Sequence, residues 1–182
     1  MTENTVTLIT GGTRSGKSRT ALEKTLPFSR KVFLATAEVT DPEMARRIER
    51  HQKERSSDFL TIEEPLYLAQ AVRHQRDRSD VVLIDCLTFW LNNLFHHFGD
   101  RTERLSKETQ EFLDVLDERP THLVVVTNEI NMGVVPTDEL SRRFVEEQGW
   151  LNQEAARRAD EVILMVAGIP QILKGSESIL ER

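Results

Sequence analysis

The sequence predicts an α/β domain in which a mainly parallel β-sheet carries helices on both faces. Short β-branched apolar runs alternate along the chain with longer segments of helical periodicity, and a strand, helix, strand repetition is typical of parallel sheets. The length of 182 residues corresponds to one domain of ordinary size. We therefore expect a single domain spanning residues 1–182.

Five apolar runs are the expected strands, because each is short, bounded by turn residues and apolar on consecutive positions, as in a strand buried on both faces. They cover residues 6–10, 32–36, 81–85, 123–127 and 162–166.

Helices are expected where apolar residues recur at spacings of three and four. This pattern covers residues 87–98, 105–116 and 140–159, and Thr137 is a possible cap of the last of these. Asp41, Pro42 and Glu43 indicate the start of another helix, capped by Asp41 or Thr40 and running to about residue 55. The polar residues 99–108 are either a loop or the first turns of the helix that follows.

Composition and charge exclude several classes of function. The net charge of -6 disfavours a nucleic-acid-coating surface, which needs a high density of cations. The apolar runs are far shorter than the about 20 residues of a membrane span, and the first residues lack the pattern of a secretory leader. Because a single cysteine excludes an internal disulfide framework, a reducing cytoplasm is the expected compartment.

The first expected strand is followed by a phosphate-binding loop. Residues 11–18 satisfy the pattern G-x-x-x-x-G-K-[ST] and lead into a helical segment. Glycines let successive backbone N–H groups turn toward phosphate oxygens, the lysine supplies a positive charge to the β- and γ-phosphates, and the serine hydroxyl can ligate Mg²⁺. The expected nucleotide-binding residues here are Gly11, Gly12, Thr13, Arg14, Ser15, Gly16, Lys17 and Ser18.

Asp85 is the candidate acidic partner of this loop. It follows four apolar residues at the end of an expected strand, so it would project from the carboxyl edge of the sheet beside the loop and, with Ser18, hold the Mg²⁺ ion. An alternative interpretation is that Asp85 caps the helix over residues 87–98.

His51 is the candidate nucleophile. Its spacing from Met44 and Ile48 places it on the apolar stripe of the expected helix over residues 41–55. Residues 46–55 contain five cations and two anions, a local charge of +3, which suits a triphosphate and favours the neutral, nucleophilic imidazole. The pattern by itself favours the alternative, a helix with a solvated basic face and a packed histidine.

Further motifs accompany the phosphate loop. They are LATA at 34–37, DPEM at 41–44 with Arg47, Ile48 and His51, DCLT at 85–88, TNE at 127–129, MGVVP at 132–136, NQ at 152–153 and ADEV at 159–162. Taken together, the chain resembles the bifunctional adenosylcobinamide kinase / adenosylcobinamide-phosphate guanylyltransferase family of cobalamin biosynthesis, from about residue 6 to residue 168.

The resemblance implies a RecA-like P-loop fold, a homotrimer and two reactions. ATP or GTP would phosphorylate adenosylcobinamide, and GMP would then pass from GTP through a guanylylated His51 to adenosylcobinamide phosphate, with Mg²⁺ as cofactor. Lys17 and Asp85 would be catalytic with His51. Beyond the phosphate loop, the implied nucleotide contacts are Leu34, Ala35, Thr36, Gln52, Lys53, Glu54, Arg55, Glu63 and Asp85. Asn131 departs from the family pattern, which usually has glycine there, and this affects the loop after Glu129.

Two rival functions remain at this point. A monofunctional P-loop kinase of a small metabolite would use the phosphate loop and Asp85 without a covalent role for His51. A non-enzymatic nucleotide-dependent switch would use the same loop to control partner contacts.

Overall fold

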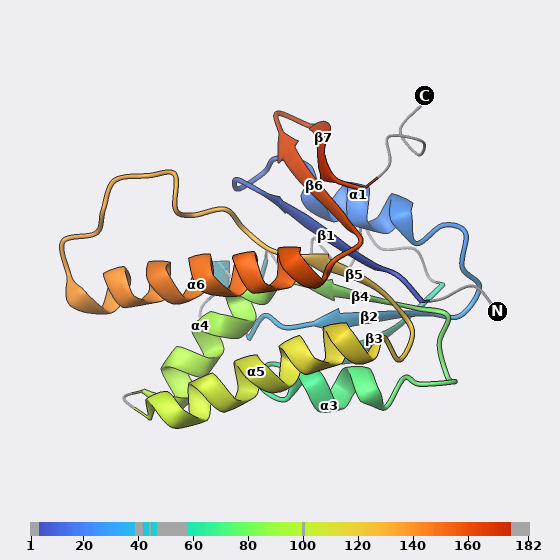
Figure 1. Ribbon diagram of the computed structural model, residues 1–182, viewed down its shortest axis with the longest axis horizontal. Helices are drawn as coiled ribbons and strands as arrows, with labels where there is room; N and C mark the ends of the chain where they lie inside the picture. The colour runs from blue at the N-terminus through green and yellow to red at the C-terminus, as the bar shows by residue number, and fades with distance from the viewer. Residues whose placement is uncertain (1–3, 39–41, 44, 47–57, 100, 176–182) are drawn as a thin grey trace.

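The computed structural model describes residues 4–38, 42–43, 45–46, 58–99 and 101–175, which form one seven-stranded sheet in the order β3-β2-β4-β5-β1-β6-β7 (Figure 1). All neighbouring strands are parallel except β6 and β7, which are antiparallel. The strands are β1 (Val6–Gly11), β2 (Lys31–Ala35), β3 (Phe59–Glu63), β4 (Val81–Asp85), β5 (His122–Val126), β6 (Glu161–Val166) and β7 (Ile169–Lys174). The predicted mainly parallel α/β fold is confirmed.

Among the described residues, helices cover the two faces of the sheet unequally. On one face lie α3 (Leu68–Arg73), α4 (Leu87–Phe98), α5 (Thr102–Glu118) and α6 (Glu139–Arg158) (Figure 1). On the other face, α1 (Lys17–Lys24) is the helix that the described residues place. Alternate strand residues serve the two cores, so that Val82 and Ile84 face the four-helix layer while Val81 and Leu83 face the α1 side.

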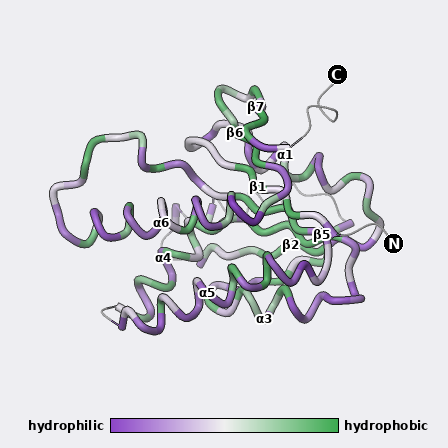
Figure 2. The backbone as a smooth tube through the Cα atoms, in the orientation of Figure 1, coloured by the Kyte–Doolittle hydropathy of each residue, from purple (hydrophilic) through white to green (hydrophobic). Residues whose placement is uncertain are grey.

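The strands are apolar along their length because both of their faces are covered (Figure 2). All four apolar residues of β4, for example, are 0% exposed. This is why the five predicted runs were recognisable, and each of them matches a strand to within about one residue at its ends.

The sequence analysis missed both edge strands. In β3, Leu60 is 62% exposed and Thr61 is exposed, so no continuous apolar run marks the strand. In β7, Pro170 and Gln171 interrupt the pattern, and Ile169 is 69% exposed. An edge strand has one neighbour and a partly solvated surface, and its sequence signal is correspondingly weak.

The helix predictions were largely correct. The helix predicted over residues 87–98 is α4, and α5 begins at Thr102, so most of the polar stretch 99–108 forms the first turns of a helix rather than a loop. The six-residue α3 was too short to predict. Thr137 was the wrong cap for α6: Asp138 is the cap, and its Oδ1 accepts a hydrogen bond of 2.8 Å from the backbone N–H of Ser141.

Of the helix expected over residues 41–55, residues 42, 43, 45 and 46 have helical backbone, and the other positions lie outside the described residues. Across the described part of the chain, every helix is too short or too polar to span a bilayer.

Candidate active site at the carboxyl edge of the sheet

The phosphate loop connects β1 to α1, and its glycines are required by close packing. Gly11 has φ 142°, and a Cβ there would overlap the backbone carbonyl oxygen of Met165 in the neighbouring strand β6. Gly16 has φ 101° and precedes the first residue of α1. Residues with a side chain rarely adopt these backbone conformations, so the glycine spacing of the motif is a geometric requirement of this loop.

Lys17 folds back over the loop. Its Nζ donates hydrogen bonds to the carbonyl oxygens of Gly11, at 2.9 Å, and Gly12, at 2.6 Å, and the residue is only 8% exposed. The backbone of Gly168, in the turn between β6 and β7, donates to the carbonyl of Ser15 at 3.0 Å. The loop conformation is therefore stabilised by hydrogen bonds from its own lysine and from the β6–β7 turn. The sequence analysis did not predict the contact with this turn.

The hydroxyl of Ser15 lies in this loop, is buried, and has no hydrogen-bond partner among the described residues. A buried polar atom without a partner costs free energy. Its place between the loop glycines suits a group that accepts hydrogen bonds, such as a phosphate. By contrast, Gly12, Thr13 and Arg14 are exposed at the crest of the loop, where Arg14 has φ 58°.

Asp85 meets the loop across the sheet. Ser18 Oγ, in the first turn of α1, donates to Asp85 Oδ2 at 3.0 Å. The alternative role of Asp85 as a helix cap is wrong: the residue at the N-cap of α4 is Cys86, in extended conformation, without a capping side-chain hydrogen bond. Because strand β5 lies between β1 and β4, the two residues meet only at the carboxyl edge, as the sequence analysis expected.

Ser18 and Asp85 suit Mg²⁺ chemically. Both present oxygen, the ligand atom that this cation prefers, and the ion usually takes one or two protein ligands together with water and substrate phosphates. Within the described residues, no group of three or more histidine, cysteine or acidic side chains forms a metal-binding cluster, so a protein cage for a softer metal is absent from this part of the chain.

The remaining predicted nucleotide contacts divide into two groups. Glu63, Ala35 and Asp85 are aligned by register at the ends of three adjacent strands, and the carboxylate of Glu63 is on the exposed edge. Leu34 and Thr36, in contrast, are 0% exposed.

Thr36 connects the end of β2 to the β4–α4 junction and to α4. Its Oγ1 donates to the carbonyl of Cys86 and accepts from the N–H of Cys86, both at 2.8 Å, and its own carbonyl accepts from Asn93 Nδ2 at 2.6 Å. The side chain of Thr36 therefore positions the β4–α4 junction.

His51 lies outside the described residues, as do Gln52, Lys53, Glu54 and Arg55. The nucleophile and its basic surroundings therefore stay predictions. Cys86 does not compete for that role, because burial raises the pKa of its thiol to about 12 and keeps it protonated at neutral pH.

A polar network behind the loop was not recognised from the sequence. The side chains of Asn152 and Gln148, in α6, form hydrogen bonds with Thr127 and Asn128, which directly follow β5. All four residues are buried or half-buried. The motifs at 127–129 and 152–153 were the only signal in the sequence.

A second unrecognised contact lies beyond the end of β2. Glu38 pairs with His97 Nε2, in the last turn of α4, at 3.0 Å.

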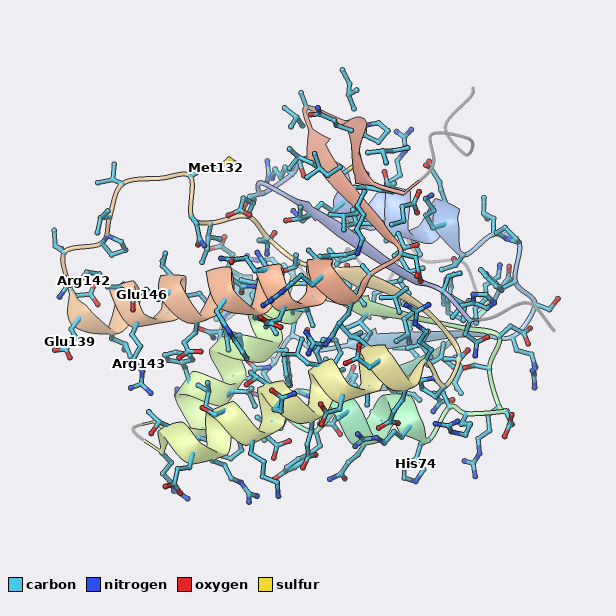
Figure 3. All side chains as sticks on the ribbon, viewed as in Figure 1. His74, Met132, Glu139, Arg142, Arg143 and Glu146 are labelled. Carbon is cyan, nitrogen blue, oxygen red and sulfur yellow. The ribbon has the colours of Figure 1, made fainter. Side chains whose placement is uncertain are left out.

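The loop between β5 and α6 extends from the site along the outside of the protein. Figure 3 shows Met132 on this loop and Glu139, Arg142, Arg143 and Glu146 along the first turns of α6. Met132, Val134 and Val135 are 81%, 96% and 74% exposed.

Asn131, the departure from the family pattern, is accommodated by a glycine in α6. A Cβ at Gly149 would overlap Asn131 Nδ2. Glycine inside a helix costs about 1 kcal/mol relative to alanine, and the close approach of the Asn131 amide explains its presence here.

The chain is similar over most of its length to known proteins of one family. Residues 7–173 match the family model described as cobinamide kinase / cobinamide phosphate guanyltransferase. The bifunctional adenosylcobalamin biosynthesis protein CobP of Pseudomonas aeruginosa is 45% identical over 172 residues, covering 92% of this chain and 96% of the relative. The bifunctional adenosylcobalamin biosynthesis proteins CobU of Escherichia coli and Salmonella typhimurium are 36% and 34% identical, each covering 89% of this chain and 96% of the relative.

Among solved structures, an ATPase from the type III secretion system of pathogenic bacteria superposes with a TM-score of 0.53 at 10% identity, over 88% of this chain and 50% of that one. This likeness supports the P-loop fold only. The family model spans residues 7–173, and these relatives are 34% to 45% identical over 89% to 92% of the chain. The chain belongs to the cobinamide kinase / cobinamide phosphate guanyltransferase family.

Proposed function

We propose that this protein phosphorylates adenosylcobinamide with ATP or GTP and then transfers GMP from GTP, through a guanylylated His51, to give adenosylcobinamide-GDP in adenosylcobalamin biosynthesis. The observation that carries the proposal is the phosphate loop closed over Lys17 with Ser18 bonded to Asp85, in a chain that matches the family over residues 7–173.

In the kinase step, the substrate hydroxyl oxygen attacks the γ-phosphorus, the bond to the bridging oxygen breaks, the nucleoside diphosphate leaves and the hydroxyl proton passes to water. Lys17 must exchange the carbonyls of Gly11 and Gly12 for phosphate oxygens, and backbone N–H groups of the loop hold the same phosphates. Ser18 and Asp85 would hold Mg²⁺, which neutralises phosphate charge when bound. Positioning and charge stabilisation supply most of the catalysis.

In the guanylyl step, an imidazole nitrogen of His51 attacks the α-phosphorus of GTP and pyrophosphate leaves. A phosphate oxygen of adenosylcobinamide phosphate then attacks the same phosphorus, the P–N bond breaks and the histidine is regenerated. The local charge of +3 over residues 46–55 favours the neutral imidazole and attracts the triphosphate.

We include cytoplasmic action and homotrimeric assembly in this proposal. The exposed apolar residues Met132, Val134 and Val135 support an assembly that covers them. The net charge of -6 argues against nucleic acid as a partner.

Intact-protein mass spectrometry after incubation with GTP and Mg²⁺ tests the proposal. We expect an increase by the mass of one GMP, located on His51 by peptide mapping and lost in acid, because a P–N bond survives base and breaks in acid. ATP without GTP serves as the control and leaves no GMP adduct. Phosphoryl transfer to cobinamide without any adduct would favour the monofunctional kinase, and absence of both would favour the nucleotide-dependent switch.

A further inference from the structure

Two amide side chains and a hydroxyl, buried or half-buried, join α6 to the end of β5. Thr127 Oγ1 donates to Asn152 Oδ1 at 2.7 Å, and Gln148 Nε2 donates to Thr127 Oγ1 at 3.1 Å and to Asn152 Oδ1 at 2.9 Å. Asn152 Nδ2 donates to the carbonyl oxygen of Asn128 at 3.0 Å. Thr127 and Gln148 are both 0% exposed. These contacts join segments that are 21 to 25 residues apart in the chain.

The end of β5 that this network holds is bonded directly to the phosphate loop. The N–H of Thr127 donates to the carbonyl of Ile9 at 2.9 Å, and the N–H of Glu129 donates to the carbonyl of Gly11 at 3.1 Å. The N–H of Asn128 points away from β1 and donates to Thr88 Oγ1 in α4, at 3.0 Å. The end of β5 thus bridges the loop glycine on one side and the α4 turn after Asp85 on the other.

The carbonyl of Gly11 has two donors, Glu129 N–H and Lys17 Nζ, which lies at 2.9 Å. When Lys17 turns to a bound phosphate it releases this carbonyl. The N–H of Glu129 then remains as the hydrogen-bond donor to the Gly11 carbonyl. It can keep this bond only if the backbone of residues 127–129 stays in the conformation seen here.

Packing does not explain the network. Gln148 Oε1 is buried without a hydrogen-bond partner among the described residues, a cost that a leucine of similar volume would avoid. The donors of Gln148 go to Thr127 and Asn152, so the amide acts as a support for those two side chains.

We propose that Gln148 and Asn152 are positioning residues that, through Thr127 and Asn128, hold the end of β5 and so preorganise the phosphate loop for nucleotide. This rests on the proposed binding of nucleotide by that loop. The network holds the phosphate loop in its binding conformation before nucleotide arrives, so less conformational entropy is lost on binding. Loss of the network therefore raises the dissociation constant of the nucleotide more than it lowers kcat.

The test compares Thr127→Val with Thr127→Ser. Valine keeps the shape of threonine but removes the hydroxyl, whereas serine keeps the hydroxyl and removes the methyl group. Dissociation constants of a non-hydrolysable ATP analogue with Mg²⁺ are measured by calorimetry on the full chain, and cobinamide phosphorylation is measured against ATP concentration. Valine removes both hydrogen bonds of the Thr127 hydroxyl, the one donated to Asn152 and the one accepted from Gln148. We expect Thr127→Val to raise the dissociation constant and the KM for ATP about tenfold. We expect kcat to change less than threefold, and Thr127→Ser to stay within twofold of wild type.

Equal affinities of Thr127→Val and wild type would overturn the inference, and so would a serine variant as weak as the valine variant, since that would indicate packing. Asn152→Asp provides a second variant if Thr127→Val does not fold: it keeps both acceptor roles and removes the donor to the Asn128 carbonyl. Asn92→Asp, the same change at an exposed position of α4, is its matched control. A wild-type protein that binds no nucleotide would contradict the proposed function itself, whereas normal binding by the folded variants would contradict only this inference.

Discussion

Replacing Lys17 with alanine is expected to depress both activities together. The Nζ atom lies at 2.9 and 2.6 Å from two loop carbonyls, so its positive charge lies inside the loop, whereas Arg14 is exposed at the crest. At about 4 Å from a phosphate charge, with an effective dielectric constant of about 20, it contributes about 4 kcal/mol. A factor of ten in rate corresponds to about 1.4 kcal/mol, so we expect a fall of about 10³ in kcat/KM.

The same change affects the empty protein much less. Gly11 retains the N–H of Glu129 on its carbonyl after the lysine is removed, and Gly12 is exposed to water. We expect a loss of about 1 to 2 kcal/mol in the free energy of unfolding, roughly one charge-assisted hydrogen bond. For a chain of this size that lowers Tm by about 2 to 8 °C, which leaves a folded protein at assay temperature.

Steady-state assays of cobinamide phosphorylation and of GMP transfer to cobinamide phosphate measure the effect, and circular dichroism checks folding. Lys107→Ala is the control, since this lysine lies on α5 with its side chain 61% exposed. A folded Lys17→Ala variant with near-normal rates in both assays would refute the role of residues 11–18. A loss confined to one reaction would mean that the two steps do not share the loop.

The remaining predictions concern the nucleophile, a largely buried ion pair and a histidine. His51→Ala should abolish the acid-labile GMP adduct and the GDP-linked product while a kinase rate remains, because phosphoryl transfer to a hydroxyl needs no protein nucleophile. Glu161→Gln should lower the free energy of unfolding by about 3 kcal/mol in thermal melts, since it leaves Lys24, bonded at 2.7 Å and 12% exposed, without its counter-charge. Burial lowers the pKa of His122, and its Nδ1 accepts the N–H of Thr5, which needs the neutral ring. The unfolded chain therefore binds more protons than the folded one, so stability is full above about pH 6.5 and falls as the pH drops below it, and His122→Gln should flatten this dependence in denaturant titrations.

Each of these has an outcome that would contradict it, and the last two have matched control variants. An adduct that persists in His51→Ala would return that residue to the packed-histidine interpretation. Glu23→Gln breaks an exposed pair, with side chains 85% and 53% exposed, and should cost less than about 0.5 kcal/mol; equal costs for the two glutamates would contradict the burial argument. His74→Gln removes an exposed histidine and should leave the pH dependence of wild type, and an unchanged slope in the His122 variant would show that another group titrates.

The amino-acid sequence by itself determined the local features of this protein. Strands buried on both faces, such as β4, are continuous apolar runs, and α4 has unbroken helical periodicity, so both were predicted with their boundaries nearly correct. The phosphate loop was recognisable for the same reason: its glycines meet conformational requirements within a few residues, as the positive φ values of Gly11 and Gly16 confirm. Edge strands such as β7 have a solvated surface and leave no comparable pattern.

Only the tertiary structure decided which distant residues meet. Asp85 had two readings, and the 3.0 Å hydrogen bond from Ser18, 67 residues earlier, selects the one beside the phosphate loop. The strand order places β5 between β1 and β4, and that order brings the amides of Gln148 and Asn152 behind the loop. The physical reason is the range of the interactions. Backbone conformation and hydrophobic periodicity depend on residues close together in the chain, so short segments of sequence reveal them. A contact across the sheet depends on the packing of all the elements that lie between the two contacting residues.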